Sequence, residues 1–128
     1  MSDKSITQRM FIKSGYKVII LNAPEGYIQT MGVIPEQVNI QNNLSPDADI
    51  IQYFTKSKAD LVENFPLLKQ ALKDDGSLWI TYPKGTSKEE TDINRDIIWE
   101  IAEKLGFKPV AMISIDTTWA AFRLKKRI

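Results

Sequence analysis

The sequence predicts a three-layer α/β domain whose sheet is mostly parallel and ends in an antiparallel hairpin. Residues 16–21 contain the continuously apolar run Val18 to Leu21, rich in β-branched residues, which is typical of a parallel strand covered on both faces. A second buried strand follows the Asp75-Gly76 pair, and apolar residues at helical spacing lie before and after it. The segment from residue 110 onward consists of two strand-like stretches joined by a short polar turn, which favours a terminal hairpin.

Length and composition indicate an ordinary globular chain. It has 128 residues, of which 43% are hydrophobic and 26% charged, so we expect one domain over residues 1–128. The net charge of +1 disfavours nucleic-acid binding driven by bulk charge. Such binding would require the basic residues near the two ends to converge on one face: Arg9, Lys13, Lys17, Lys125, Lys126 and Arg127.

The chain contains neither cysteine nor histidine. Disulfides, zinc sites built on these residues and mechanisms with a histidine base are therefore excluded. Accordingly, the sequence predicts no catalytic set, no metal site and no bound cofactor. The N-terminus has no apolar stretch of the signal-peptide type, and the longest apolar run, residues 18–21, is too short to span a bilayer. We expect a cytoplasmic protein that does not enter a membrane.

The first elements are predicted from apolar runs and their boundaries. Residues 5–10 favour a short helix, and residues 16–21 form the first strand. Pro24 suits the first position of a helix and Gly32 suits the position after its end, so we expect a helix over residues 24–31.

The middle of the chain predicts two strands and a helical segment. Residues 38–40 are expected to form a short edge strand and residues 49–54 a longer one. Residues 58–72 carry an apolar stripe at helical spacing, formed by Leu61, Phe65, Leu68 and Leu72. Pro66 lies inside this segment, so we expect a short turn of helix followed by a second helix that starts at Pro66.

The last elements follow the same logic. A turn at residues 74–76 precedes the strand around Trp79, and Pro83 ends that strand because proline cannot donate to the ladder. Thr91 or Asp92 is expected to cap the next helix, and Gly106 to close it. The hairpin then comprises residues 110–115 and 119–125.

This order of elements resembles a reduced Rossmann-like sheet, and residues 49–125 are similar to the C-terminal half of class I methyltransferases. The match is architectural: helix, Asp-Gly turn, strand, helix, Gly-Phe pair and hairpin. After the first strand the chain reads Asn22-Ala23-Pro24-Glu25-Gly26, which is no counterpart of the Gly-rich cofactor loop. Directly after Ile40 come Gln41, Asn42 and Asn43, so no acidic residue is placed there to bind a ribose hydroxyl. The resemblance implies the fold and does not carry over the activity.

A second resemblance extends over about residues 6–127. The chain resembles the StaR-like family of small uncharacterised bacterial proteins, a domain of unknown function, in several pieces that occur in the same order. These pieces are Val18 to Gly26, Gly76 to Trp79 with Tyr82-Pro83-Lys84, Thr91 to Ile93, and Asp116 to Trp119 with Arg123. The chain departs from the family at Gly85, where members often carry a second basic residue, and at Ala120, where many carry serine. The resemblance implies a fold and a family, without established functional residues.

The carboxyl ends of the parallel strands predict the position of a site, because ligands of open α/β sheets bind there. Helix N-termini expected near Pro24 and Asp92 would add backbone donors. We therefore predict a site for a small anionic ligand from strand-end and capping residues: Asn22, Pro24, Lys56, Tyr82, Lys84, Asn94 and Arg95. The alternative is that each of them only satisfies local backbone groups.

Asp116, Trp119 and Arg123 form a second constellation. Trp119 and Arg123 are four residues apart on a strand, so their side chains lie on one face. Arg123 is expected to stack on Trp119 and to pair with Asp116. The interpretation that the sequence favours is a brace within the hairpin.

Two kinds of function remain open. The favoured one is a non-catalytic binding or regulatory domain for a small anionic ligand or a protein partner, since familiar catalytic residues and the cofactor loop are missing. The alternative is a small, degenerate transferase-like enzyme that uses Lys84 or Asp92 at the same edge. The exposed edges of a truncated sheet also need covering or pairing, for which a homodimer is one solution.

Overall fold

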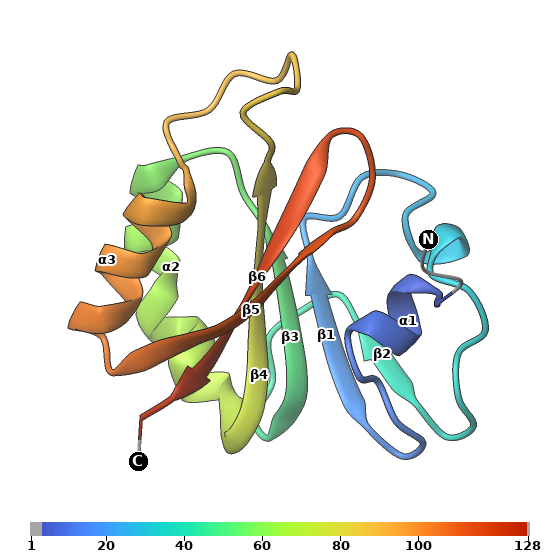
Figure 1. Ribbon diagram of the computed structural model, residues 1–128. Coiled ribbons are helices and arrows are strands. Elements are labelled where there is room, and N and C mark those ends of the chain that lie inside the picture. The colour runs from blue at the N-terminus through green and yellow to red at the C-terminus, as the bar shows by residue number, and fades with distance from the viewer. Residues whose placement is uncertain (1–3, 128) are drawn as a thin grey trace.

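The computed structural model describes residues 4–127. Six strands form one sheet in the order β2-β1-β3-β4-β6-β5 (Figure 1). The strands β1 to β4 pair in parallel, whereas β6 runs antiparallel to both β4 and β5. Their bounds are Lys17–Leu21 for β1, Asn39–Gln41 for β2, Ala48–Phe54 for β3, Leu72–Pro83 for β4, Phe107–Ser114 for β5 and Trp119–Lys126 for β6. The predicted α/β fold with a mostly parallel sheet and a terminal hairpin is confirmed.

The strand order reverses beside β1. The chain leaves β1 to form β2 on one side of it and then returns to form β3 on the other side. Ile19 therefore has Gln41 of β2 as one neighbour and Ile51 of β3 as the other. The carboxyl ends of β1 and β3 thus diverge into connections on opposite sides, which is the place where open α/β sheets bind ligands.

Two helices cover one face of the sheet (Figure 1). They are α2, Lys58–Ala71, and α3, Arg95–Lys104. Side chains cap both, because Ser57 accepts from the Asp60 amide and Asn94 from the Ile97 amide. Their apolar stripes pack on alternate residues of the central strands to form the larger core.

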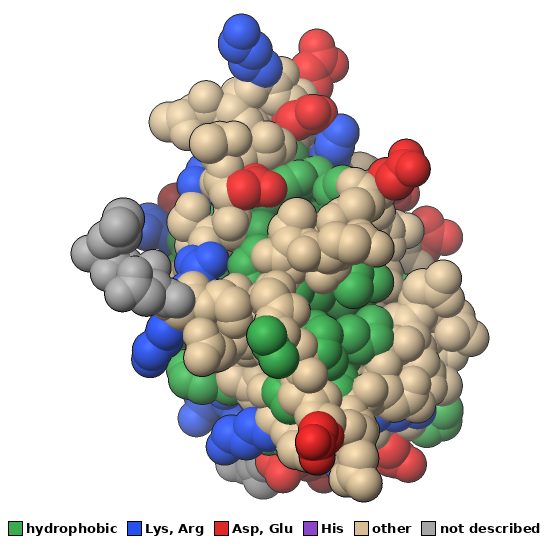
Figure 2. Space-filling model, turned by 90° about the vertical axis from the view of Figure 1, so that its right-hand side faces the viewer, with side chains coloured by type: hydrophobic (Ala, Val, Ile, Leu, Met, Phe, Trp, Pro, Cys, Tyr) green, Lys and Arg blue, Asp and Glu red, His purple; other side chains and the backbone are tan. Residues whose placement is uncertain are grey.

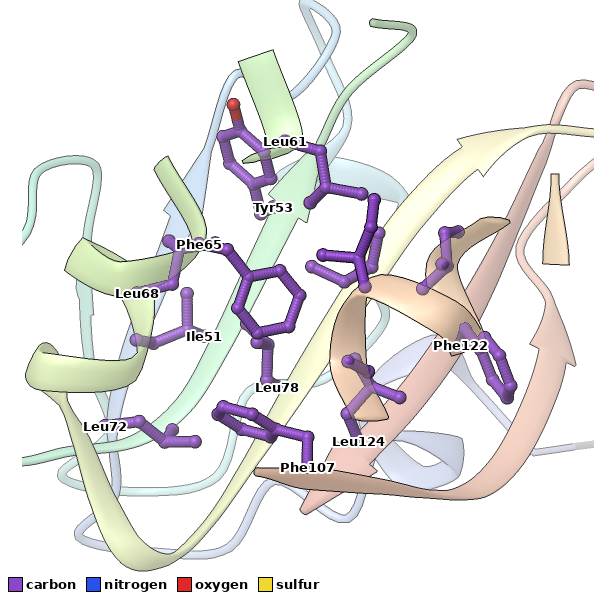
Figure 3. Packing of buried hydrophobic residues seen from close by; sticks show 14 of the residues in the cluster. Ile51, Tyr53, Leu61, Phe65, Leu68, Leu72, Leu78, Phe107, Phe122 and Leu124 are labelled. Carbon is purple, nitrogen blue, oxygen red and sulfur yellow. The ribbon is translucent and has the colours of Figure 1, made fainter. Parts of the chain in front are cut away.

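The larger core contains a contact between two phenylalanine rings. Phe65 of α2 meets Phe107 of β5 edge to face at 5.2 Å, and Leu78 of β4 lies beside them (Figure 3). Such a pair stabilises the fold by about 1 kcal/mol beyond the contribution from burying its two side chains. The contact ties the start of the hairpin to the helical layer.

Short segments cover the other face. They are α1, Ile6–Arg9, the 3₁₀ turn η1, Ile28–Thr30, and the loops around them. The fully buried side chains of Met10 and Met31 pack in this second core together with Trp79. Figure 2 shows this face, where hydrophobic side chains are visible in a band along the middle, between regions of backbone and other side chains. The layer is therefore thin, and side chains of the sheet lie close beneath it.

Four local predictions are wrong, and the fourth concerns residues 74–76. The expected helix over residues 24–31 is only η1, because Asn22 and Gly26 take positive φ angles of 61° and 82° and turn the chain before a helix can start. The helix α2 continues through Pro66, since burial of its apolar stripe outweighs the loss of one backbone hydrogen bond. The residue that caps α3 is Asn94.

The expected caps, Thr91 and Asp92, have another role. The Thr91 hydroxyl donates to the Lys56 carbonyl at 2.7 Å, and the Asp92 carboxylate accepts from the Lys58 amide at 2.7 Å. They tie the loop after β4 to the start of α2. Residues 74–76 also differ from expectation, because they lie inside β4 and form no turn between helix and strand.

The remaining element predictions are confirmed with small shifts of their ends. The helix expected at residues 5–10 is α1, which Ser5 and Gln8 close with a reciprocal capping box. The edge strand expected at residues 38–40 is β2. Within residues 4–127, no helix has the length and apolar character needed to cross a membrane.

Candidate functional site

A hollow of about 540 Å³ opens at the carboxyl ends of β1 and β3. We call it the switch-point hollow. Its volume lies in the range of small-molecule sites. Its lining comes first from the strand ends and the start of α2: Asn22, Pro24, Phe54, Thr55, Lys56, Ser57 and Asp60. The loop after β4 adds Glu89, the turn between β5 and β6 adds Thr118, and the first residue of β6 adds Trp119.

One wall of the switch-point hollow is aromatic. The Trp119 ring meets Phe54 edge to face at 5.1 Å, and Phe54 is almost fully buried. The Asp116 carboxylate holds the turn before Trp119, because it accepts from the Thr118 and Trp119 amides at 2.8 Å each. The partly buried Trp119 side chain is thus held at the edge of the hollow, where a planar ligand ring has a surface to stack on.

Carboxylates outnumber ammonium groups in the lining of the switch-point hollow. The Lys56 ammonium pairs with the Glu89 carboxylate at 2.7 Å and lies 6.0 Å from the centroid of the Trp119 ring. The Asp60 carboxylate lines the same hollow and has no hydrogen-bond partner within residues 4–127. Because Glu89 already matches Lys56, Asp60 makes the lining net negative. These charges favour a ligand with a positive group and do not support the predicted preference for an anion.

A second hollow, of about 430 Å³, adjoins the first at the carboxyl ends of β1 and β2. The two share Asn22 and Pro24, so they continue one another along this edge of the sheet. The Asn22 amide donates to the Phe54 carbonyl at 3.4 Å and links the ends of β1 and β3. Asn42 after β2 offers an amide to a ligand at the position where dinucleotide-binding folds place a carboxylate.

A buried polar chain lies beneath both hollows. The Tyr27 hydroxyl donates to the Gln52 side-chain oxygen at 2.9 Å, and the Gln52 amide donates to the Thr81 hydroxyl at 3.1 Å. Burial is the main cause that raises the pKa of Tyr27 to about 12, and the hydrogen bond with Gln52 opposes it. Tyr27 is therefore a neutral hydrogen-bonding group that positions the loop after β1.

The structure brings three of the predicted site residues together. Asn22, Pro24 and Lys56 line the switch-point hollow. Tyr82 belongs to the core on the other face, where burial raises the pKa of its hydroxyl and the hydroxyl contacts the Met112 sulfur at 3.4 Å.

The other three predicted residues bind within the protein and lie outside the lining of that hollow. The Lys84 ammonium donates to the Ser114 hydroxyl. Asn94 caps α3, and Arg95 pairs with its neighbour Asp96 at 3.4 Å.

The expected stacking of Arg123 on Trp119 is wrong. Four residues of a strand span about 13 Å, so two side chains on the same face at this spacing are too far apart to touch. The guanidinium of Arg123 lies 4.8 Å from the centroid of the Phe11 ring and 5.9 Å from that of Trp79. Asp116 is also taken, since it accepts from the turn before Trp119.

Several lining residues were missed by the sequence-based reasoning. Thr55 and Ser57 flank Lys56 directly after a buried strand, and this position was a usable signal. Glu89 and Thr118 come from loops without periodicity, so nothing in the pattern placed them at this edge. In the part of the chain that the structure describes, no cluster of His, Cys, Asp or Glu is arranged to hold a metal ion.

Comparison by sequence identifies no family. No family model matches the chain, and the resemblance to the StaR-like family therefore stays a prediction. A segment of 66 residues, which is 52% of the chain, is 32% identical to the carbamoyl phosphate synthase large chain of Methanothrix thermoacetophila and spans 6% of that protein. A match to so small a part of another protein does not show membership of its family.

Comparison by structure is more informative. A SAM-dependent methyltransferase from Thiobacillus denitrificans, solved with S-adenosyl-L-homocysteine, has a TM-score of 0.61 and 12% identity over 94% of this chain and 88% of its own. DhpI in its SAH complex has a TM-score of 0.67 and 7% identity over 96% and 82%.

The mitomycin 7-O-methyltransferase MmcR has a TM-score of 0.64 and 10% identity over 88% of this chain. The chain spans about half of that protein, or 49%. At identities this low the likeness concerns the fold alone. The chain therefore has the Rossmann-like fold of the SAM-dependent methyltransferases.

Proposed function

We propose that the chain is a transferase-like domain that binds S-adenosylmethionine, or an adenosyl ligand of similar size, in the switch-point hollow. The observation that carries the proposal is the position of this hollow. It opens where the strand order reverses, in a sheet whose fold is that of proteins solved with S-adenosyl-L-homocysteine.

The residues of the switch-point hollow fit this ligand chemically. S-adenosylmethionine carries a planar adenine and a positively charged sulfonium, and it has no phosphate. The Trp119 ring suits the adenine, and the Asp60 carboxylate suits the positive charge. The Gly-rich cofactor loop of the class I methyltransferases has no counterpart in this chain, so the side chains of the hollow would have to hold the ligand. Asn42 lines the adjoining hollow at the ends of β1 and β2, and its amide would hydrogen-bond a ribose hydroxyl of a ligand that extends into that hollow.

The proposal is one of binding and assigns no catalytic residue. Bound S-adenosylmethionine supplies an electrophilic methyl group, and the residues named here would hold and orient the ligand. Lys84 and Asp92, which the sequence suggested for chemistry, do not line the hollow, whereas Lys56 and Asp60 do. A transferase reaction at this edge would therefore take place beside Lys56 and Asp60.

Calorimetric titration with two ligands tests the proposal. S-adenosylhomocysteine has a neutral sulfur, so it differs from S-adenosylmethionine in the charge that Asp60 would sense. Asp60→Asn should weaken binding of S-adenosylmethionine about fivefold and of S-adenosylhomocysteine much less, because a partly exposed charge pair contributes about 1 kcal/mol. The control is Asp96→Asn, an exposed aspartate that occupies the first turn of α3 as Asp60 does that of α2.

The control variant should bind both ligands as the wild type does. Absence of binding for both ligands, with a protein that unfolds cooperatively, would contradict the proposal. An equal loss in Asp60→Asn and Asp96→Asn would place the ligand elsewhere.

A further inference from the structure

A third hollow, of about 380 Å³, lies at the opposite edge of the sheet. We call it the Arg123 hollow. Ser77 near the start of the buried part of β4 and Asp49 near the start of β3 line it, so it opens at the amino ends of the parallel strands. The switch-point hollow is at their carboxyl ends. A ligand in the Arg123 hollow is therefore independent of the function proposed above.

Arg123 is held in this hollow without a counter-charge. Its Nε donates to the Ser77 hydroxyl at 3.0 Å, and the rings of Phe11 and Trp79 lie against its guanidinium. No carboxylate within residues 4–127 pairs with Arg123, and its two Nη atoms have no hydrogen-bond partner among those residues. Their N–H groups are thus left for a ligand.

Burial lowers the pKa of Arg123, and the nearby Tyr16 acts in the opposite direction. Partial removal from water is the larger of these two influences, as expected for a charge that lacks a partner. An arginine that is partly removed from water usually contacts an oxyanion, because the guanidinium fork suits a bidentate contact with one.

The surrounding charges also favour an anion. Lys13 and Lys125 line the same hollow. Of the two carboxylates there, Asp49 is already engaged, since it accepts from the Lys17 amide and from the Lys73 ammonium at 2.9 Å each. Asp75 is exposed, and its charge acts on Lys73. Three cationic side chains therefore face one carboxylate that is not already engaged.

We propose that the Arg123 hollow binds a small oxyanion, a phosphate or a carboxylate group, through the Nη atoms of Arg123. Phe11 and Trp79 fix the guanidinium, so the fork is positioned before the ligand arrives. Lys13 and Lys125 add attraction at the rim. The remaining volume leaves room for the organic part of a phosphate monoester or of a small carboxylic acid.

Nuclear magnetic resonance on the ¹⁵N-labelled protein tests this inference. Inorganic phosphate and citrate are the two probes, titrated separately at constant ionic strength, so that phosphate and carboxylate chemistry are distinguished. A saturable shift of the Arg123 Nε–H signal and of the Trp79 indole signal is expected with at least one probe. The indole signal of Trp119, in the other hollow, should not move.

Two variants sharpen the test. Arg123→Lys keeps the charge and loses the fork, so it should weaken binding about tenfold or more. Lys125→Gln leaves Arg123 in place and should weaken binding about threefold. Lys104→Gln, an exposed cation on α3, is the matched control and should change nothing.

Shifts that rise linearly without saturation would overturn the inference, as would equal losses in Lys125→Gln and Lys104→Gln. Movement of the Trp119 indole in place of the Trp79 indole would also overturn it, since the anion would then bind at the other edge.

Discussion

The Tyr27 hydroxyl donates a 2.9 Å hydrogen bond to the side-chain oxygen of Gln52 beneath the loop that follows β1. Gln52 in turn donates to Thr81, and neither Gln52 nor Thr81 has any exposed surface. The contact therefore links this loop to two central strands through groups that water does not reach. Buried polar groups are costly when unpaired, so these hydrogen bonds hold the loop in place and thereby fix where Asn22 and Pro24 lie at the site.

Substitution of Gln52 tests this link. Gln52→Met keeps the length of the side chain and removes both of its hydrogen bonds, leaving the Tyr27 hydroxyl without its acceptor. We expect the free energy of unfolding in urea to fall by about 1 to 3 kcal/mol. The control is Gln70→Met at an exposed position of α2, which should stay within about 0.5 kcal/mol of the wild type. Equal changes in the two variants would contradict a special role for Gln52.

The raised pKa of Tyr27 predicts a pH dependence of stability. Tyrosine in the unfolded chain ionises near pH 10, whereas burial raises the pKa of Tyr27 to about 12 in the folded protein. Between these values the unfolded state loses its proton first, so the stability that Tyr27 confers is complete below about pH 10 and falls as pH rises toward 12. The full loss amounts to about 2 to 3 kcal/mol.

Tyr27→Phe isolates this effect, because it removes the ionisable group and retains the ring. The wild type should exceed the variant most in stability below about pH 10, and the difference should shrink between about pH 10 and 12. Urea unfolding at a series of pH values measures it. A difference that stays constant over that range would show that Tyr27 ionises alike in the folded and unfolded states.

Gly76 permits a close approach of two strands. A Cβ atom at this position would lie 2.7 Å from Leu72 Cδ1 and 2.9 Å from the Asp49 carbonyl oxygen. The second neighbour is backbone and cannot rotate away, so Gly76→Ala should destabilise the protein by about 1 to 3 kcal/mol. At Gly85, a Cβ atom would meet nothing within 4 Å, and Gly85→Ala is the matched control. Thermal unfolding of both variants gives the answer, and a Gly76→Ala protein as stable as the control would refute the argument.

The strands were predictable because their signals are local. Apart from Lys17, Asp49 and Gln52, residues 16–21 and 49–54 are apolar, and valine and isoleucine are frequent among them, as expected for strands covered on both faces. The expected helix after Pro24 failed because its two boundary signals were correct for a helix but were outweighed by left-handed turns at Asn22 and Gly26. The predicted break at Pro66 is wrong for a different reason. Burial of the apolar stripe of α2 in the tertiary structure overrides the local preference of proline to end a helix.

The candidate site was predictable only in part. Asn22 and Lys56 follow strands directly, and the rule that ligands bind at strand ends places them together. Glu89 reaches the same hollow from a loop 33 residues away from its partner Lys56, and the sequence contains no signal for that pairing. The sequence points to Arg123 but pairs it wrongly with Trp119. The residues that Arg123 contacts, Phe11 and Ser77, lie at the other end of the sheet.

The most direct measurement follows the indole N–H signals of the three tryptophans during titration with S-adenosylmethionine. Trp119 lies in the switch-point hollow, Trp99 donates to Glu103 on the surface of α3, and Trp79 is fully buried. Binding at the proposed place predicts a saturable shift of the Trp119 signal, with Trp99 and Trp79 unchanged. A Trp119 signal that does not move while S-adenosylmethionine binds, or the absence of any binding, would contradict the central claim.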